Sequence, residues 1–175
     1  MTKIAHLGAY DTNIGDNIAL YNVRKYVEKE SNASIEWTKV ELKDFYKCNM
    51  NKKYCIQRMK EISDNHDMLI IGGGGLIQQQ NANYSNRFNL PFYKEVLDVI
   101  DIPIMCLSVG FNIFRRAHKS RTPDNQKIVH FSECEPLSST FLENLLLLID
   151  KSAFFSFRND GSITQLMPHL NEHFK

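Results

Sequence analysis

Four short stretches of the sequence combine glycines with polar side chains of the kinds that hold small ligands. Each stretch lies just behind a short apolar run, so each could begin where a strand ends. Hydroxyl, amide, carboxylate and guanidinium groups beside bare backbone suit recognition of a small polar or anionic molecule. The residues are Asn13, Gly15 and Asp16; Gly72, Gly73, Gly74, Gly75 and Gln78; Ser108, Gly110 and Asn112; and Arg158, Asp160 and Ser162.

The run of four glycines, residues 72–75, needs a physical reason, because glycine loses more backbone entropy on ordering than any other residue. Without a Cβ atom, a ligand can contact the main chain, and positive φ angles let successive N–H groups point the same way. A tight turn with close helix packing is the alternative explanation. The run is neither a Walker A loop nor a GxGxxG motif, because the required lysine and spacing are missing.

The charged residues of these stretches each have two interpretations. Asn13 and Asp16 could cap a helix, or could bond ligand hydroxyls and accept a proton. Arg158 follows an apolar run that is expected to be a buried strand, where its guanidinium would need Asp160, another carboxylate or an anionic ligand as partner. The basic run 115–121 is either a solvated face or a means of gathering an anion.

The elements that must position these residues alternate between strand and helix. Such alternation predicts an α/β protein with a doubly wound, mainly parallel sheet and helices on both faces. The expected strands are 3–7, 34–42, 67–71, 102–110 and 153–157, and the expected helices are 15–30, 53–62, 90–100, 138–150 and 160–167.

Parallel strands with right-handed crossovers place all their carboxyl ends at one edge of the sheet, where ligands of such folds bind. The four stretches should therefore meet in one cleft. The pattern predicts a single domain over residues 1–175, with a long irregular connection at 111–137 in which "KIVHFS" could add a short strand.

The composition argues against several classes of function. The net charge of +1 argues against nucleic-acid binding, and no apolar run has the length of a membrane span. The first residues lack the apolar region of a signal peptide, and the four cysteines form no CxxC pair. We therefore expect a reduced, cytoplasmic protein without a disulfide framework or a metal site.

Taken in order, the four stretches resemble the motifs of the polysaccharide pyruvyl transferases. Asn-x-Gly-Asp lies at residues 13–16, Asp-x-Leu-Ile-x-Gly-Gly-Gly-Gly is matched over 67–75, Ser-x-Gly lies at 108–110, and Ser-x-Arg-x-Asp-x-Ser lies at 156–162. The resemblance covers most of residues 3–167. It departs from the family pattern at Asn159, which separates the usual Arg-Asp pair.

The resemblance implies a Rossmann-like domain that forms one half of a GT-B fold. It also implies transfer of the enolpyruvyl group of phosphoenolpyruvate to a sugar of a surface glycan, giving a pyruvate ketal, with no metal or organic cofactor. Asp16 and Arg158 then become the catalytic candidates, as an acid/base or hydroxyl contact and an anion contact. The other residues named above become substrate-binding candidates, and the partners are a glycan acceptor and a small anionic donor.

Family members are about twice as long, so the second domain is expected to be absent from this chain. The chain would then be a piece of a longer protein, a natural half that forms a homodimer, or a relative without catalysis, and we expect little or no activity from residues 1–175 alone. Two other functions stay open: half of a nucleotide-sugar glycosyltransferase, and a non-catalytic binding or assembly module.

Overall fold

The computed structural model describes residues 1–10, 14–80, 85–112, 117–121, 127–131, 136–159 and 161–170. Its centre is a five-stranded sheet with the order β2-β1-β3-β4-β7, in which every pair of neighbours is parallel. The strands are β1 (Thr2–Gly8), β2 (Ile35–Glu41), β3 (Met68–Ile77), β4 (Ile104–Phe111) and β7 (Phe154–Phe157).

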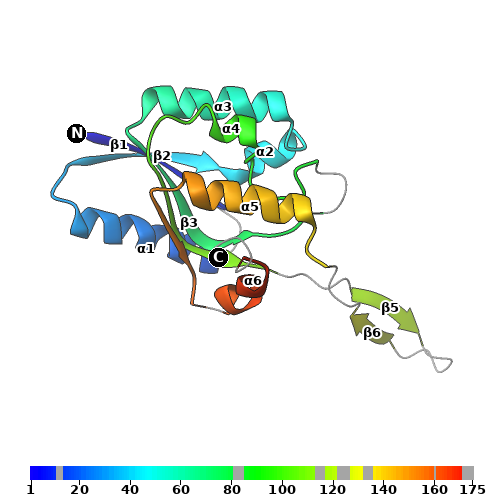
Figure 1. Cartoon of the computed structure of the whole chain (residues 1–175). Helices are drawn as coiled ribbons and strands as arrows, with labels where there is room; N and C mark the ends of the chain where they lie inside the picture. Colours follow the sequence, from blue (N-terminus) through cyan, green and yellow to red (C-terminus); the bar gives the residue numbers. More distant parts are fainter. Residues whose placement is uncertain are drawn as a thin grey trace.

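Helices cover the two faces of this sheet unequally. On one side, α1 packs against β3, and the other side carries α3, α4 and α5 (Figure 1). The short α6 packs against α5 and β4. The helices are α1 (Ile14–Glu30), α2 (Leu42–Lys47), α3 (Lys52–Asn65), α4 (Lys94–Leu97), α5 (Ser139–Lys151) and α6 (Ser162–Leu170).

The unequal cover follows from the distribution of apolar residues. The main core lies under α3, α4 and α5 and includes Leu69, Ile71, Phe92 and Phe141, all fully buried. The α1 side holds a small second cluster, whose buried members are Ile4, Val23 and Ile70. Since one helix cannot cover five strands, the β4 and β7 part of this face lacks a helix of its own within the described residues.

The predicted fold class is confirmed, and so are most elements. Two predictions were wrong. The strand expected at 67–71 continues through the glycines to Ile77, because β4 pairs with it along its whole length. The helix expected at 90–100 has only the four residues of α4, because Pro91 and Phe92 are buried outside the helix and Tyr93, with an extended backbone, is its N-cap.

The connection at 111–137 was predicted to be irregular, with one optional strand, but it contains a hairpin. β5 (Ala117–Arg121) and β6 (Lys127–Phe131) form a separate antiparallel pair, drawn away from the main sheet in Figure 1. The basic side chains at 115–121 lie outside the described side chains.

Both ends of this connection are fixed at the end of β3. The Asn112 N–H donates to the Ile77 carbonyl at 2.8 Å, and the Gln79 side chain donates to the Pro136 carbonyl at 3.1 Å. Gln79 also accepts from the Ser138 N–H at 2.6 Å, directly before α5. The connection therefore leaves and rejoins the domain at neighbouring points.

Within the described residues, no helix combines the length and the apolar composition that a membrane span requires.

Candidate functional site

A cleft with a volume of about 720 Å³ opens at the carboxyl edge of the sheet, between the start of α1 and the ends of β3, β4 and β7. It brings together predicted residues from all four sequence stretches. These are Gly15 and Asp16 from α1, Gly75 and Gln78 from the end of β3, Asn112 after β4, and Arg158 after β7.

The four glycines have two kinds of close neighbour. The first two glycines lie against the backbone of other elements. A Cβ atom on Gly72 would collide with the Leu107 carbonyl oxygen of β4. A Cβ atom on Gly73 would lie 2.7 Å from the Leu20 backbone of α1, and Gly73 also has a φ of +79°. These two glycines exist because α1 and β4 approach the backbone of β3 closely, which supports the packing explanation for this half of the run.

The second half of the run faces the polar groups of the cleft. A Cβ atom on Gly74, whose φ is +137°, would lie 2.6 Å from the Asp16 carboxylate. A Cβ atom on Gly75 would collide with the side-chain amide of Asn112, which donates to the Gly75 carbonyl at 2.8 Å. Gly74 and Gly75 therefore make room for the side chains that surround the cleft.

Three polar residues of the cleft wall were missed from the sequence: Asn22, Tyr46 and Asn89. Asn89 accepts from the Gln78 N–H at 2.8 Å and donates to the Leu76 carbonyl, so it holds the end of β3 in place. Asn22 lies two turns into α1, six residues after Asp16, and helical periodicity places it roughly 120° around the helix from Asp16, so the sequence offered no signal that both line one cleft.

Ser108 has an unusual backbone conformation inside β4. Its φ is +54°, which non-glycine residues rarely adopt, and the pairing of β4 with β7 shifts register between Cys106 and Val109. The Ser156 hydroxyl stabilises this bulge, because it accepts from the Ser108 N–H at 3.0 Å and donates to the Cys106 carbonyl at 3.3 Å. Such strain concentrates at functional sites.

Ser108 lines a second cavity, of about 500 Å³, on the α1 side of the sheet. Gly73, Ser156 and Asn22 contribute to its wall, and Asn22 and Ala19 also line the cleft. The two cavities are therefore neighbours on the two sides of the same segment of α1.

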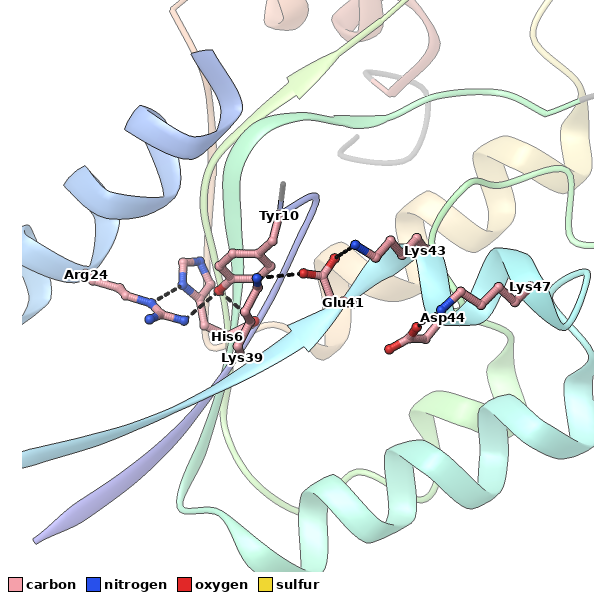
Figure 2. Close-up of polar contacts among 8 residues, drawn as sticks. All are labelled: His6, Tyr10, Arg24, Lys39, Glu41, Lys43, Asp44 and Lys47. Carbon is pink, nitrogen blue, oxygen red and sulfur yellow. Dashed lines mark hydrogen bonds and ion pairs between the residues drawn. The ribbon is translucent and has the colours of Figure 1, made fainter. Parts of the chain in front are cut away.

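A buried histidine, His6 of β1, links the glycine run to α1, and Figure 2 shows its contacts with Arg24 and Tyr10. Arg24 Nε donates to His6 Nδ1 at 3.1 Å, and the opposite nitrogen, His6 Nε2, lies 3.3 Å from the Gly72 carbonyl oxygen. Because Nδ1 accepts, Nε2 carries the proton and donates to Gly72. Arg24 also donates to the Tyr10 hydroxyl at 2.8 Å, which donates to the His6 carbonyl at 3.0 Å.

This arrangement requires a neutral imidazole. Burial of His6 and, to a smaller extent, the nearby Arg24 charge together lower its pKa from 6.5 to about 4, against the opposing effect of the bond to Gly72. Burial likewise raises the pKa of Tyr10, although Arg24 opposes that shift. His6 thus serves as a structural support for the first glycine.

The same figure shows ion pairs that continue from this network toward α2. Glu41, at the end of β2, pairs with Lys39 at 2.9 Å and with Lys43 at 3.7 Å, and Asp44 pairs with Lys47 at 2.9 Å. The Lys39 ammonium also lies 4.6 Å from the centre of the Tyr10 ring. These five side chains lie outside the cleft wall, and each of the two carboxylates has at least one lysine partner.

Arg158 lines the cleft, but its surroundings differ from those predicted. It was expected to follow a buried strand, whereas β7 is an edge strand and Arg158 itself is exposed. Its N–H donates to the Val109 carbonyl at 2.9 Å, which fixes its backbone beside the end of β4. Its guanidinium therefore stands at the rim of the cleft and not in a dry interior.

The remaining predicted residues either do not line the cleft or are not among the residues that the structure describes. Gly110 and Ser162 are buried, and the Ser162 hydroxyl accepts from the Phe111 N–H at 2.7 Å. Gly72 and Gly74 lie beneath the wall, and Gly73 lines the second cavity. Asn13 and Asp160 lie outside the described residues.

Among the described residues, the cleft wall contains one carboxylate, one guanidinium and several amides. This set can bind hydroxyl groups and a small anion, and its carboxylate could exchange a proton with a ligand. Among the described residues, no cluster of three or more His, Cys, Asp or Glu side chains is arranged to hold a metal ion.

Two comparisons bear on identity. The family model for polysaccharide pyruvyl transferases matches residues 13–170, and a search of curated proteins gives no match. The matched region begins at the residue before α1 and ends with the last residue of α6, and it contains all four stretches from which the cleft is built. The chain therefore belongs to the polysaccharide pyruvyl transferase family.

Proposed function

We propose that the cleft takes part in transfer of the enolpyruvyl group of phosphoenolpyruvate to a sugar of a surface glycan, which becomes a pyruvate ketal. The observation that carries the proposal is the meeting of Asp16 and Arg158 in one cleft with side-chain amides and glycine backbone. Family membership supplies the class of reaction.

The donor has a phosphate and a carboxylate, so its site needs cationic and N–H groups. Arg158 offers a planar pair of N–H donors that match either anion. Gln78 and Asn112 add neutral amides at the end of β3 and after β4, which suit the enol ester oxygen or sugar hydroxyls.

The proposed transfer is balanced in atoms and protons. Protonation of the donor's methylene carbon gives positive character to C2, and a sugar hydroxyl oxygen bonds to C2 as its proton leaves. A second hydroxyl of the sugar then displaces phosphate from C2, and its proton leaves with the phosphate. The products are the ketal and inorganic phosphate, so the site must supply an acid, a base and an anion contact.

Asp16 is the proposed proton carrier. It lies in the first turn of α1, and its carboxylate faces Gly74 at the cleft wall. A carboxylate in that place can accept a proton from a sugar hydroxyl or hold that hydroxyl by a hydrogen bond.

Binding of phosphoenolpyruvate to the purified chain tests the proposal. A ligand that binds the native state raises the melting temperature, so phosphoenolpyruvate should do so at millimolar concentration. Arg158→Ala should abolish the rise, because removing a charge-assisted contact costs about 1.5–3 kcal/mol, or roughly 10- to 150-fold in affinity. Arg58→Ala is the matched control, because Arg58 is an exposed arginine paired with Glu61 on α3, away from the cleft.

Three results would contradict the donor assignment. They are no shift with phosphoenolpyruvate, an equal shift in Arg158→Ala, and a shift with UDP alone. The last result would favour the glycosyltransferase alternative. Residues 1–175 alone should form little ketal, because Arg158 is the only basic side chain among the described residues of the cleft wall, whereas the donor carries two anionic groups.

A further inference from the structure

Two serines stand on either side of Arg158 in the sequence, and both bind the backbone of β4. Ser156 lies two residues before the arginine, on β7, and Ser162, the first residue of α6, lies four residues after it. The Ser156 hydroxyl accepts from the Ser108 N–H at 3.0 Å. The Ser162 hydroxyl accepts from the Phe111 N–H at 2.7 Å. The chain on both sides of the arginine is therefore joined to β4 through a hydroxyl group.

The backbone of Arg158 is bonded to β4 between these two points. Its N–H donates to the Val109 carbonyl at 2.9 Å, and Val109 lies between Ser108 and Phe111. The arginine side chain lines the cleft. The place of its guanidinium at the rim therefore depends on where β4 holds this short piece of backbone.

A bulge in β4 sets which residue of that strand lies beside Arg158. Cys106 pairs with Phe155, and the next pair recorded along the strands is Val109 with Phe157. Three steps along β4 therefore match only two along β7. Without the extra residue, Val109 would lie opposite Arg158, and the arginine would be set back from the carboxyl edge by one residue, or about 3.3 Å. The bulge thus brings the arginine closer to the cleft.

Ser156 holds this bulge at two points. Its hydroxyl accepts from the Ser108 N–H and donates to the Cys106 carbonyl at 3.3 Å, so both of these bonds stay within the sheet. Ser108 has a φ of +54°, a conformation that persists in a non-glycine residue only where its surroundings require it. Ser156 lines the second cavity and not the cleft, so its hydroxyl supports β4 and does not face the proposed donor site.

Ser162 supports the other side of the arginine from a buried position. The residue is 1% exposed and does not line the cleft, so a ligand there cannot reach its hydroxyl. It begins α6, which packs against β4. Its bond to the Phe111 N–H therefore ties the start of this helix to the end of β4.

We propose that Ser156 and Ser162 are positioning residues, which hold Arg158 at the place on the rim of the cleft where it meets an anion. The pattern Ser-x-Arg-x-x-x-Ser over residues 156–162 then has a physical reason, because each serine ties one side of the arginine to β4. The proposal rests on the proposed function for the identity of the anion, but not for the position of the arginine.

Hydrogen exchange at the Arg158 backbone N–H, followed by NMR in the ligand-free chain, tests the positioning. Neither serine bonds to this N–H, so its protection changes only if the loss of a hydroxyl is transmitted to the arginine. Ser156→Ala and Ser162→Ala should each lower this protection by about 3- to 10-fold, measured against the amides of the central strand β3, which exchange only on global opening.

Ser63→Ala is the matched control for hydrogen exchange. The Ser63 hydroxyl on α3 also accepts from a backbone N–H, that of Asp101 at 2.9 Å, but it does not line the cleft. This variant should leave the relative protection at Arg158 unchanged. Ser156 is only partly buried, so Ser156→Ala carries the test if Ser162→Ala does not fold.

Affinity for phosphoenolpyruvate, measured by NMR titration, shows whether Ser156 acts through the arginine. Ser156→Ala should weaken binding by about 3- to 10-fold. Ser156→Thr keeps the hydroxyl, and the second cavity has room for its methyl group, so it should restore binding to within about twofold of wild type. In the Arg158→Ala background, Ser156→Ala should have no further effect, because a residue that acts only through the arginine loses its influence with it.

Unchanged exchange at the Arg158 N–H in both serine variants would overturn the proposal, even if their melting temperatures fall, because the serines would then be structural only. An equal loss of affinity from Ser156→Ala in the wild-type and Arg158→Ala backgrounds would also overturn it, because Ser156 would then act on the ligand without the arginine. Failure of the donor proposal looks different: the wild-type chain would not bind phosphoenolpyruvate, and the exchange measurement alone would decide the positioning of Arg158.

Discussion

At the scale of single residues, the glycine run shows that one sequence feature can serve two purposes. Gly72 and Gly73 are required by backbone packing against β4 and α1, whereas Gly74 and Gly75 are required by side chains of the cleft. The sequence alone could not separate these purposes. The decisive neighbours, Leu20, Leu107 and Asn112, lie far from the run in sequence and reach it only through the fold.

Substitution of Gly73 should be among the most destabilising changes in the chain. Gly73→Ala combines a positive φ with a collision against the α1 backbone, so we expect a loss of more than about 3 kcal/mol in unfolding free energy. Gly161→Ala is the control, because Gly161 has a φ of +89° and no close neighbour, and it should lose about 1–2 kcal/mol. Urea denaturation measures both, and equal losses would show that packing against α1 is not what requires Gly73.

At the scale of elements, α1 is the part of the fold that holds the site together. It supplies Asp16 and Asn22 to the cleft, packs on Gly73 through Leu20, and reaches Gly72 through Arg24 and His6. Its start and end were predictable from its apolar stripe. The contribution of Arg24 was not, because its partner His6 reads in the sequence as one more residue of an apolar strand.

The pKa of His6 gives the stability of the protein a specific pH dependence. Because its folded pKa of about 4 lies below the ordinary 6.5, the unfolded chain binds more protons between these values, so stability is full above pH 6.5 and falls toward pH 4. The loss amounts to about 3 kcal/mol. In His6→Gln, whose amide can still bond to Arg24 and Gly72, this part of the loss should disappear.

Chemical denaturation between pH 4 and pH 7.5 measures this effect. His169→Gln is the control, because it removes an exposed histidine on α6 and leaves the buried one in place. If wild type and His6→Gln show parallel pH profiles, His6 is not the group that titrates.

The strands of the main sheet could be predicted from the sequence better than the connections between them. Apolar runs predicted four of the five strands of the main sheet, and alternation of apolar and polar residues predicted the edge strand β2, so the parallel carboxyl edge was predictable as well. The same reasoning failed for α4, where Pro91 and Phe92 are buried in a non-helical segment. Apolar periodicity cannot distinguish a helix from a buried extended chain over so few residues.

At the scale of the whole molecule, the domain and the 113–135 segment are separable. The segment leaves at Asn112 and returns at Pro136, and both residues are bonded to the end of β3 through Ile77 and Gln79. Two residues of chain span at most about 7 Å, so the two anchors lie close together. Neither anchor depends on the hairpin of β5 and β6.

Replacement of residues 113–135 by a short Gly-Ser linker should therefore keep the fold. We expect a melting temperature within about 5 °C of the full chain, because the closure entropy of a loop changes slowly with its length. Circular dichroism melting measures it, and Gln79→Ala in the shortened chain is the comparison that removes the anchor. A shortened chain that does not fold would mean that the hairpin supports the main sheet.

Because the 113–135 segment lies between β4 and β7 in the chain, β7 is synthesised well after the other strands of the main sheet. Four of the five strands lie within residues 1–111, but β7 follows only after 42 more residues. At a synthesis rate of about 5–20 residues per second, the outer edge of β4 stays without its neighbour for roughly 2–8 seconds. An unpaired strand edge is a template for association between chains, so newly made chains are most exposed to aggregation in this interval. The strained bulge at Ser108 lies on that same edge and interrupts it until Ser156 arrives.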